Sequence, residues 1–524
     1  MIDMILFIAL TLAAQQPQQS QEPQPNFADY PAQDAISYDI KLEILASGQV
    51  EGSVEYHFRA LEKIATIYLD RTASETWQVE FAELDGKKII VGENAYQYQI
   101  PLPIIASPGD DIVFTANFKG WPADGLYRER NYLGDTYFFS DGFPSRTRAW
   151  LPCEDSNADR AQFSLELTAP AGWSSIGSGA WTTSKAEGGG SISHGQTKSP
   201  IPPSLFAFAA GPFARVNEDG DARFLPHYVF PQDAELAGKY LVHHATWMAW
   251  MEEKFGDYLY AKFTTVQIPT RWGGMEYPGN VWLAQKIFKY PGGGVGTMAH
   301  EFAHMWFGDG VGYARWQDAW LSEGFASYIG PVLHELIGDT NLTDEMRSAR
   351  SRWLRAKPAH KKPIVDHEFS SSEDFFGRYS SNTYQKAAWV LHMLRDTVGD
   401  DLFFASVRDY YQSYQSQAVE TISLIESFNK VCQRDLSWFF DQWLLRPGCP
   451  EITVKLDLET GGLLVAQPNT NFSFDLLVRY KDADGKTVSK TLSVPGTCET
   501  IYSLGEGAHD LEIDPDVHLL FILK

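Results

Sequence analysis

The spacing of apolar residues changes twice along this chain, and these changes limit the folds that it can adopt. In AISYDIKLEIL, residues 35–45, apolar side chains alternate with polar ones, and such alternation predicts a strand with one buried face. The same pattern returns in GSVEYHFRA, ATIYLDR and DIVFTANFKG. We therefore expect residues 28–215 to form an N-terminal antiparallel β domain with its own core.

The apolar spacing switches to three and four residues after Pro231. The segment AELAGKYLVHHATWMAWMEEKFG has this spacing and ends on Gly256, as a helix should. Residues 295–307, 318–336, 382–397 and 419–445 show the same period. Residues 216–446 are therefore expected to be mainly helical.

Alternation returns after the Pro and Gly residues of LLRPGCP. EITVKLDLE, LLVRYKDADGKTVSKTLSV and HLLFILK alternate around a turn at Asp484 and Gly485, which predicts a small β domain over residues 450–524. A chain of 524 residues exceeds the size at which one hydrophobic core stops growing. The fold class is therefore multidomain α+β.

The charge balance excludes nucleic acid as a partner. The chain has 67 acidic and 43 basic residues, a formal net charge of −24, whereas phosphate binding needs a cationic surface. The same field attracts cationic ligands, including free amino termini. One basic island is interpreted as a solvated helix face followed by a loop; it comprises Arg347, Arg350, Arg352, Arg355, Lys357, Lys361 and Lys362.

The first residues, MIDMILFIALTLAAQQPQQSQEPQP, are typical of an export signal. We interpret residues 1–14 as a signal peptide and residues 15–27 as a Gln/Pro-rich linker, although Asp3 and the lack of Lys or Arg depart from the usual pattern. The alternative, a signal anchor, needs about 20 apolar residues, whereas the apolar run from Met4 to Leu12 has nine. The protein is thus expected to be periplasmic or extracellular, with no stable membrane insertion after signal removal.

Four cysteines lie at positions 153, 432, 449 and 498 without a CxxC pair, which argues against metal binding by cysteine. In an oxidising compartment a bridge between Cys432 and Cys449 is one possibility.

The sequence VGTMAHEFAHMWFGDG contains the chain's most specific chemical motif, HExxH. On a helix, His300 and His304 are offset by about 40° and rise by about 6 Å, so both imidazoles can meet one ion. Glu301 is rotated by about 100° from its neighbour, which suits a general base acting on metal-bound water.

A catalytic zinc needs a third protein ligand and keeps one position open for water. The segment WQDAWLSEGFASYIG predicts a second helix that Asp318 opens, and Glu323 within it follows His304 by 19 residues. Two histidines and a glutamate would complete an open zinc site. Because ligating histidines usually donate their other N–H to a carboxylate or carbonyl, Asp318 is a candidate for that supporting contact.

These motifs together resemble the M1 family of zinc aminopeptidases. HEFAH is followed after 18 residues by Glu323 in WLSEGFASY and is preceded by GGMEYPG, while RAWLPCEDSNADRAQFSLEL and PPSLFAFAAGPF resemble segments of the family's β domain. The resemblance implies a thermolysin-like, mainly helical catalytic domain and a small C-terminal β-sandwich. It also implies the short three-domain form, without the helical C-terminal domain of larger members.

The resemblance implies a role for each matched residue. His300, His304 and Glu323 would bind one zinc ion per chain, and Glu301 would polarise the attacking water and pass its proton to the leaving amine. Tyr384, in SSNTYQKAAWVLHMLR, would stabilise the oxyanion.

The GxME stretch would lie along the substrate cleft. Gly273, Gly274 and Met275 would line the substrate path, and Glu276 would bind the free α-amine. An ammonium group held there allows only the first peptide bond to reach the water.

Two positions depart from the family's pattern. Tyr277 follows Glu276 where Asn is commonest, and Phe143 stands where many members place a second amine-binding residue. Asp141 is close enough in sequence to be that helper.

The sequence therefore predicts a zinc-dependent aminopeptidase whose substrates are peptides with a free N-terminus. The alternatives are a metallopeptidase with unusual N-terminal tolerance, including endopeptidase action, and a catalytically inactive binding module. The preferred first side chain and the oligomeric state are not encoded in any motif.

Overall fold

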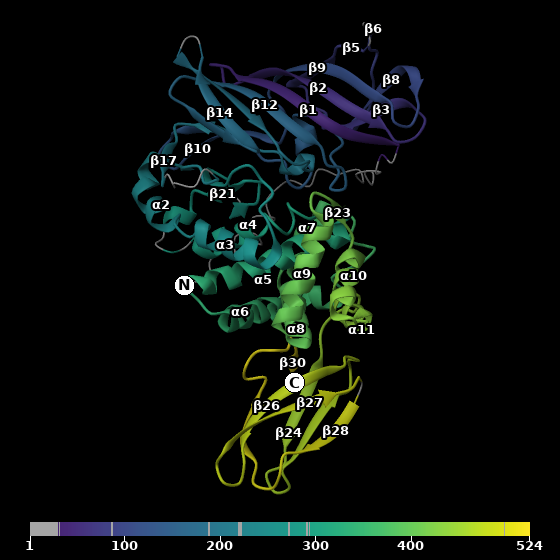
Figure 1. The fold of residues 1–524 in the computed structure, drawn as a ribbon, viewed down its shortest axis with the longest axis vertical. Coiled ribbons are helices and arrows are strands. Elements are labelled where there is room, and N and C mark those ends of the chain that lie inside the picture. The colour runs from purple at the N-terminus through teal and green to yellow at the C-terminus, as the bar shows by residue number, and fades with distance from the viewer. Residues whose placement is uncertain are drawn as a thin grey trace. The chain divides into compact units, whose positions relative to one another are not determined.

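The computed structural model describes residues 30, 32–84, 87–186, 189–217, 223–270, 273–289, 292, 294–496 and 498–524. The predicted signal peptide and linker, residues 1–27, lie outside the described residues. The described part forms two compact units, and each is treated on its own. The first lies within Met1–Val242 and Leu259–Glu301, and the second comprises His243–Tyr258 and Phe302–Lys524 (Figure 1).

A seven-stranded sheet forms the first part of unit one. Its strands are, in spatial order, β14 (Ala180–Lys185), β15 (Ser191–Gln196), β12 (Gln162–Ala169), β1 (Gln33–Ile44), β2 (Val50–Ala60), β9 (Asp111–Gly120) and β4 (Trp77–Phe81). The predicted alternation is confirmed, because Tyr38, Ile40, Leu42 and Ile44 are all buried. The expectation of purely antiparallel pairing is wrong for β1 and β12, which are parallel and are joined by the long intervening chain that a parallel pair requires.

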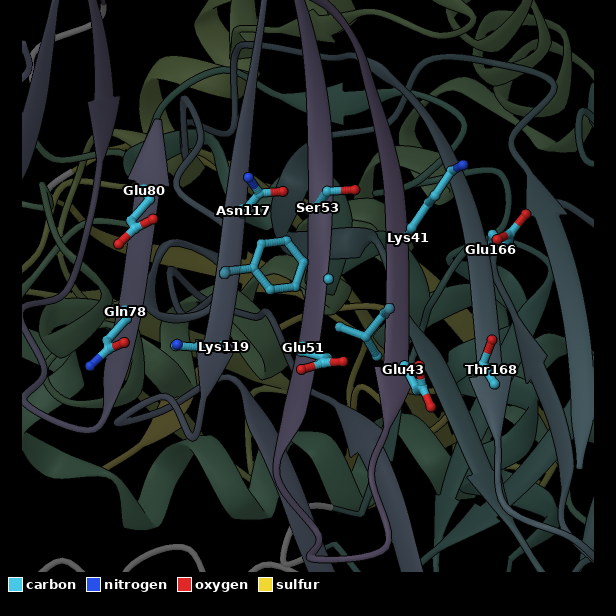
Figure 2. Close-up of a pocket in the computed structure, with 13 residues that line it drawn as sticks. Lys41, Glu43, Glu51, Ser53, Gln78, Glu80, Asn117, Lys119, Glu166 and Thr168 are labelled. Atoms are coloured by element: carbon cyan, nitrogen blue, oxygen red, sulfur yellow. The ribbon is translucent and has the colours of Figure 1, made fainter. Parts of the chain in front are cut away.

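The opposite face of this sheet is polar and hollowed (Figure 2). Two cross-strand rows of outward residues cover it: Glu166, Lys41, Ser53, Asn117 and Glu80 in one, and Thr168, Glu43, Glu51, Lys119 and Gln78 in the other. The hollow contains none of the predicted site residues. Alternation along the strands therefore separates a core face from a hydrated face.

Unit one also contains smaller sheets. They are β10 (Leu126–Arg130) with β11 (Thr136–Ser140), β16 (Phe208–Gly211) and β13 (Ser174–Gly177); β3 (Ile64–Asp70) with β8 (Gln97–Ala106) and β7 (Gly92–Glu93); and the pair β5 (Glu83–Leu84) and β6 (Lys87–Lys88).

A mixed five-stranded sheet completes unit one. It comprises β17 (Ala214–Val216), β18 (His227–Val229), β19 (Thr264–Ile268), β21 (Asn280–Ala284) and β20 (Gly274–Met275), with helices α2 (Ala234–Tyr240) and α4 (Val295–Ala303). The sequence predicts mainly helix here and misses this sheet. Every residue of β19 and β21 is buried, so these strands show no alternation.

Helices dominate the first part of unit two. They are α3 (His244–Phe255), α5 (Trp320–Leu336), α6 (Leu342–Arg355), α7 (Ser372–Phe376), α8 (Ala387–Val398), α9 (Asp400–Tyr414), α10 (Thr421–Cys432) and α11 (Ser437–Leu444), with the short parallel strands β22 (Gly312–Tyr313) and β23 (Ala418–Val419). The predicted helices at 318–336, 382–397 and 419–445 correspond to α5, α8, α10 and α11. Among the described residues, no helix is long and apolar enough to span a bilayer.

The predicted strands after residue 450 are present in unit two. One sheet comprises β28 (Cys498–Ser503), β25 (Gly462–Gln467), β24 (Glu451–Leu456) and β30 (Ile522–Leu523), and the other β27 (Thr487–Val494), β26 (Phe474–Lys481) and β29 (His509–Ile513). The hairpin of β26 and β27 turns at Gly485, whose φ of 75° suits glycine.

Two smaller interpretations change with the structure. Arg350 of the basic island is not merely solvated, because its Nη1 lies 3.2 Å from Asp514 Oδ2 and donates to the Leu519 carbonyl. Cys432 and Cys449 are both free thiols, so the bridge between them is not formed.

Candidate active site

Helix α4 carries the HExxH motif at its C-terminal end. His300 and Glu301 lie in its last turn, and His304 follows immediately after Ala303. The helix is apolar on most sides, with Met298 and Phe302 among its buried residues. Glu301 is 6% exposed and His304 fully buried, so neither side chain is a solvated surface group.

The ring of His304 is fixed from one side. Its Nδ1 lies 3.0 Å from the Phe307 carbonyl oxygen and 3.1 Å from Ser322 Oγ. The carbonyl can only accept, so Nδ1 carries the proton and the lone pair is on Nε2. That Nε2 lies 3.4 Å from Glu323 Oε2.

Gly308 allows this close packing around His304. Its φ is 116°, and a Cβ there would lie 2.3 Å from Ser322 Oγ and 3.0 Å from His304 Nδ1. Any larger residue would therefore displace the two groups that orient the imidazole.

Glu323 and Tyr384 meet within unit two. Glu323 lies in the first turn of α5 and is 5% exposed, and its Oε1 accepts a hydrogen bond of 2.7 Å from the Tyr384 hydroxyl. Tyr384 belongs to a π-helical turn, Asn382–Lys386, that leads into α8. Such turns frequently occur at functional sites because they reorient one side chain within a helix.

The GGMEYPGN segment places Glu276 beside Glu301 within unit one. Met275 pairs with Trp282 of β21, and the side chains of Met275 and Tyr277 belong to one buried apolar cluster. Alternation along the chain directs Glu276, between them, to the other side. A carboxylate oxygen of Glu276 lies within 4.8 Å of one of Glu301.

Gly274 packs directly against Glu301. A Cβ at this glycine would lie 2.3 Å from Glu301 Oε1 and 2.6 Å from its Cδ. The backbone of the GGME segment thus forms part of the wall that holds the Glu301 carboxylate.

Asp141 is joined to the same segment through Tyr277. The Tyr277 hydroxyl donates to Asp141 Oδ1 over 3.0 Å, and Arg146 Nη2 lies 2.6 Å from the same oxygen. Burial raises the pKa of the Asp141 carboxyl, and the charge of Arg146 opposes that rise. Phe143 is partly buried against the apolar cluster that contains Tyr277.

Comparison with protein families decides what kind of chain carries this arrangement. The Peptidase M1 N-terminal domain matches residues 34–204, and the Peptidase family M1 domain matches residues 240–443. The chain belongs to peptidase family M1. The predicted resemblance is thereby confirmed.

Individual M1 relatives are distant. Aminopeptidase N of Streptomyces lividans is 24% identical over 82% of this chain, leucine aminopeptidase 2 of Emericella nidulans 25% over 60%, and membrane alanyl aminopeptidase of Heliothis virescens 22% over 73%. The matched regions cover 52%, 53% and 41% of these proteins, so the chain spans about half the length of the relatives it matches.

The M1 family is zinc-dependent, and the residues of this M1 chain fit such an ion. His300, His304 and Glu323 each offer one ligand atom, and these atoms lie within 4.8 Å of one another. Two ligands of a tetrahedral zinc at about 2.1 Å are separated by roughly 3.4 Å, which is the distance between His304 Nε2 and Glu323 Oε2. The buried Glu323 carboxylate also favours a nearby cation.

The predicted role of Asp318 is wrong. Its Oδ1 accepts from both the backbone N–H of Thr421, at 2.8 Å, and the Thr421 hydroxyl, at 2.6 Å. Asp318 therefore caps the N-terminus of α10, and none of the hydrogen bonds described for it in unit two goes to a histidine. It lies in a 3-10 turn before α5 and makes no side-chain cap to that helix.

Sequence reasoning missed the groups that do orient His304. Phe307 acts through its carbonyl, which any residue could supply. Ser322 precedes Glu323 directly, and that adjacency to a proposed ligand is the only signal that could have suggested it.

Proposed function

We propose that this chain is a zinc-dependent aminopeptidase that hydrolyses the first peptide bond of peptides with a free N-terminus. The observation that carries the proposal is that His300, His304 and Glu323 each offer a ligand atom within 4.8 Å of one another, while the carboxylates of Glu276 and Glu301 lie within the same distance of each other. One group suits a metal ion, and the other supplies a base and an anion for an ammonium.

His300, His304 and Glu323 would hold one zinc ion. When bound, zinc polarises the peptide carbonyl and lowers the pKa of a coordinated water. Because Nδ1 of His304 carries the proton, the ring's lone pair is on Nε2, the atom that would ligate the ion.

Glu301 would act as the general base. It cannot share the ligand face of the two histidines, because it is rotated by about 100° from His300 on the helix. The wall formed by Gly274 limits where its carboxylate can go. It would take a proton from the attacking water and return it to the leaving amine.

Tyr384 would donate a hydrogen bond to the oxyanion that forms at the scissile carbonyl. Its hydroxyl already points toward the metal group, since it donates to Glu323 Oε1. A modest turn of the side chain would exchange that acceptor for the substrate oxygen.

Glu276 would bind the substrate α-amine, with Gly273, Gly274 and Met275 along the substrate path. Glu276 is 8% exposed, and an ammonium group entering so dry a site needs a paired anion. Anchored beside Glu301, the amine places only the first peptide bond within reach of the base. Asp141 remains a proposed helper in binding the amine. It would act through its other carboxylate oxygen, because Tyr277 and Arg146 both contact Oδ1.

Three further features belong to the proposal. The protein would be exported to the periplasm or exterior by residues 1–14. The helical part over residues 216–446 would be thermolysin-like, and the strands after residue 450 would form a separate β-sandwich, giving three domains.

A metallopeptidase that tolerates modified N-termini is the second candidate. It is favoured by one observation: Tyr277 and Arg146 both contact Asp141 Oδ1, so the predicted second amine-binding residue is held by the protein's own side chains. The N-acetylated substrate distinguishes it from a strict aminopeptidase.

The test compares free and N-acetylated aminoacyl substrates on the zinc-loaded protein and on Glu301→Gln. We expect cleavage of the free form alone and loss of at least about a hundredfold in kcat in the variant, with zinc content unchanged. Glu426→Gln, an exposed glutamate on α10, is the charge-matched control and should keep full activity. Substantial turnover by a zinc-replete Glu301→Gln protein would refute the role of Glu301, and an inactive wild type would favour the binding module.

A further inference from the structure

The GGMEY segment has one end fixed by a sheet and the other by a buried side chain. On one side of Glu276, Met275 pairs with Trp282 of β21. On the other side, Tyr277 is fully buried, and its ring meets the Trp282 ring edge-on at 4.7 Å. A turn then closes, with the Asn280 N–H donating to the Tyr277 carbonyl over 2.7 Å. Glu276 therefore lies between two anchored residues.

The hydroxyl of Tyr277 reaches a distant segment of unit one. It donates to Asp141, which is 136 positions away in sequence and follows strand β11. Asp141 is 6% exposed and makes an ion pair of 2.6 Å with Arg146. The hydrogen bond therefore ends on a buried carboxylate that is itself fixed.

The segment from Asp141 to Arg146 is closed on itself. The Arg146 N–H donates to the Gly142 carbonyl over 2.7 Å, and the guanidinium carbon lies 6.0 Å from the centre of the Tyr127 ring on β10. Arg146 thus balances the Asp141 charge and holds the carboxylate in position for the Tyr277 hydroxyl. A rigid, charge-assisted acceptor makes a stronger hydrogen bond than a neutral one.

We propose that Tyr277 is a positioning residue for Glu276, anchored through its hydroxyl to the Asp141–Arg146 ion pair. This inference rests on the proposed function, in which Glu276 binds the substrate amine. The geometry assigns Asp141 to the protein's own tyrosine, so it acts on the amine indirectly by fixing the backbone that carries Glu276. Consecutive Cα atoms are about 3.8 Å apart, so a shift of Tyr277 is transmitted directly to Glu276.

The test measures binding as well as turnover. In the zinc-loaded Glu301→Gln background, trialanine and N-acetyl-trialanine are titrated by calorimetry with Tyr277 intact or changed to phenylalanine. The phenylalanine ring keeps the contact with Trp282 and removes only the hydroxyl. Tyr137→Phe is the matched control, because Tyr137 is equally buried in the same apolar cluster and packs on Phe230 at 4.5 Å.

We expect Tyr277→Phe to weaken trialanine binding about tenfold, the effect of losing one hydrogen bond to a charged acceptor. Binding of the acetylated peptide to Tyr277→Phe should change less than about twofold. Binding of trialanine to the control Tyr137→Phe should also change less than about twofold. In the active protein, KM should rise while kcat changes little, since the metal group and base are untouched. Asp141→Asn should act in the same direction, and the double variant should be no worse than the worse single one.

Equal trialanine affinity of Tyr277→Phe and Tyr137→Phe would overturn the inference. So would an equal loss for free and acetylated peptides, because a merely structural role would not distinguish them. Failure of the proposed function is separable: the wild type would then show no turnover, whereas the dependence of free-amine binding on Tyr277 would still decide the positioning role.

Discussion

Replacing Gly274 with alanine tests whether the position of Glu301 controls the reaction. The added Cβ would lie 2.3 Å from Glu301 Oε1 and 2.6 Å from both Cγ and Cδ. Ordinary contacts between such atoms begin near 3.5 Å, so the carboxylate must move by roughly 1 Å. A misplacement of that size can cost about a hundredfold in rate. We therefore expect kcat/KM for a free aminoacyl substrate to fall about a hundredfold.

The neighbouring glycine supplies a matched control. A Cβ on Gly273 would meet no atom within 4 Å, and neither glycine has φ in the left-handed region. Alanine is therefore compatible with the backbone at both positions, and the free energy of unfolding should change by less than about 1 kcal/mol in each variant. Zinc content should also stay constant, because no ligand is touched.

The assay is steady-state cleavage of the fluorogenic substrate by both variants, with urea unfolding and metal analysis on the same preparations. Equal kcat for Gly274→Ala and Gly273→Ala would refute the reasoning; kcat is compared because Gly273 lies along the proposed substrate path, where an added Cβ acts on KM. A loss of stability or zinc that accounts for the lower rate would also contradict it, because the argument places the effect on Glu301 alone.

Three other perturbations address different parts of the chain. Tyr384→Phe removes the 2.7 Å hydrogen bond to Glu323 and the proposed oxyanion donor, so kcat should fall about a hundredfold with KM little changed, as steady-state kinetics can check. Burial raises the pKa of Glu154 from 4.5 to about 9. Between these pH values the Glu154 carboxyl therefore keeps its proton in the folded state and loses it in the unfolded chain. Stability should then decline as pH rises between these values, by at most about 1.4 kcal/mol per pH unit for this group; urea unfolding of Glu154→Gln should show a flatter pH profile, and an unchanged slope would contradict the assignment. Arg148→Met leaves Asp155, 2.9 Å from the Arg148 Nε, as a buried and unpaired carboxylate, so urea unfolding should show a loss of about 3–5 kcal/mol, and a loss below about 1 kcal/mol would contradict it.

The spacing of apolar residues in the sequence predicted those helices and strands in which apolar and polar residues recur with one regular period. The strands β1, β2 and β9 each have one buried face and one hydrated face, so their alternation is visible in sequence. Strands β19 (TTVQI) and β21 (NVWLA) are buried on both faces and were missed, because their polar and apolar residues are buried alike and do not alternate. The parallel pairing of β1 with β12 was also missed, since alternation specifies which face is buried and not which strand is the neighbour.

The same limit applies to the candidate site. The spacing of His300 and His304 could be interpreted because a helix converts four residues into one face. The partners of His304 could not, because the Phe307 carbonyl and the Ser322 hydroxyl act through short contacts that no spacing encodes. Asp318 was assigned to the wrong neighbour for a related reason: an acid before one helix served the N-terminus of another, α10, more than 100 residues later.

The two departures from the M1 pattern are physically one feature. Tyr277 stands where Asn is commonest, and its hydroxyl is useful in a buried site only if an acceptor faces it, because an unpaired buried hydroxyl costs about 1–3 kcal/mol. Asp141 supplies that acceptor, and Arg146 offsets the cost of burying the carboxylate. With these groups engaged with one another, Phe143 can face the apolar cluster without leaving a polar group unmatched. A substitution at any one of the three polar positions therefore disturbs the other two, and through Tyr277 it reaches the residue proposed to hold the substrate amine.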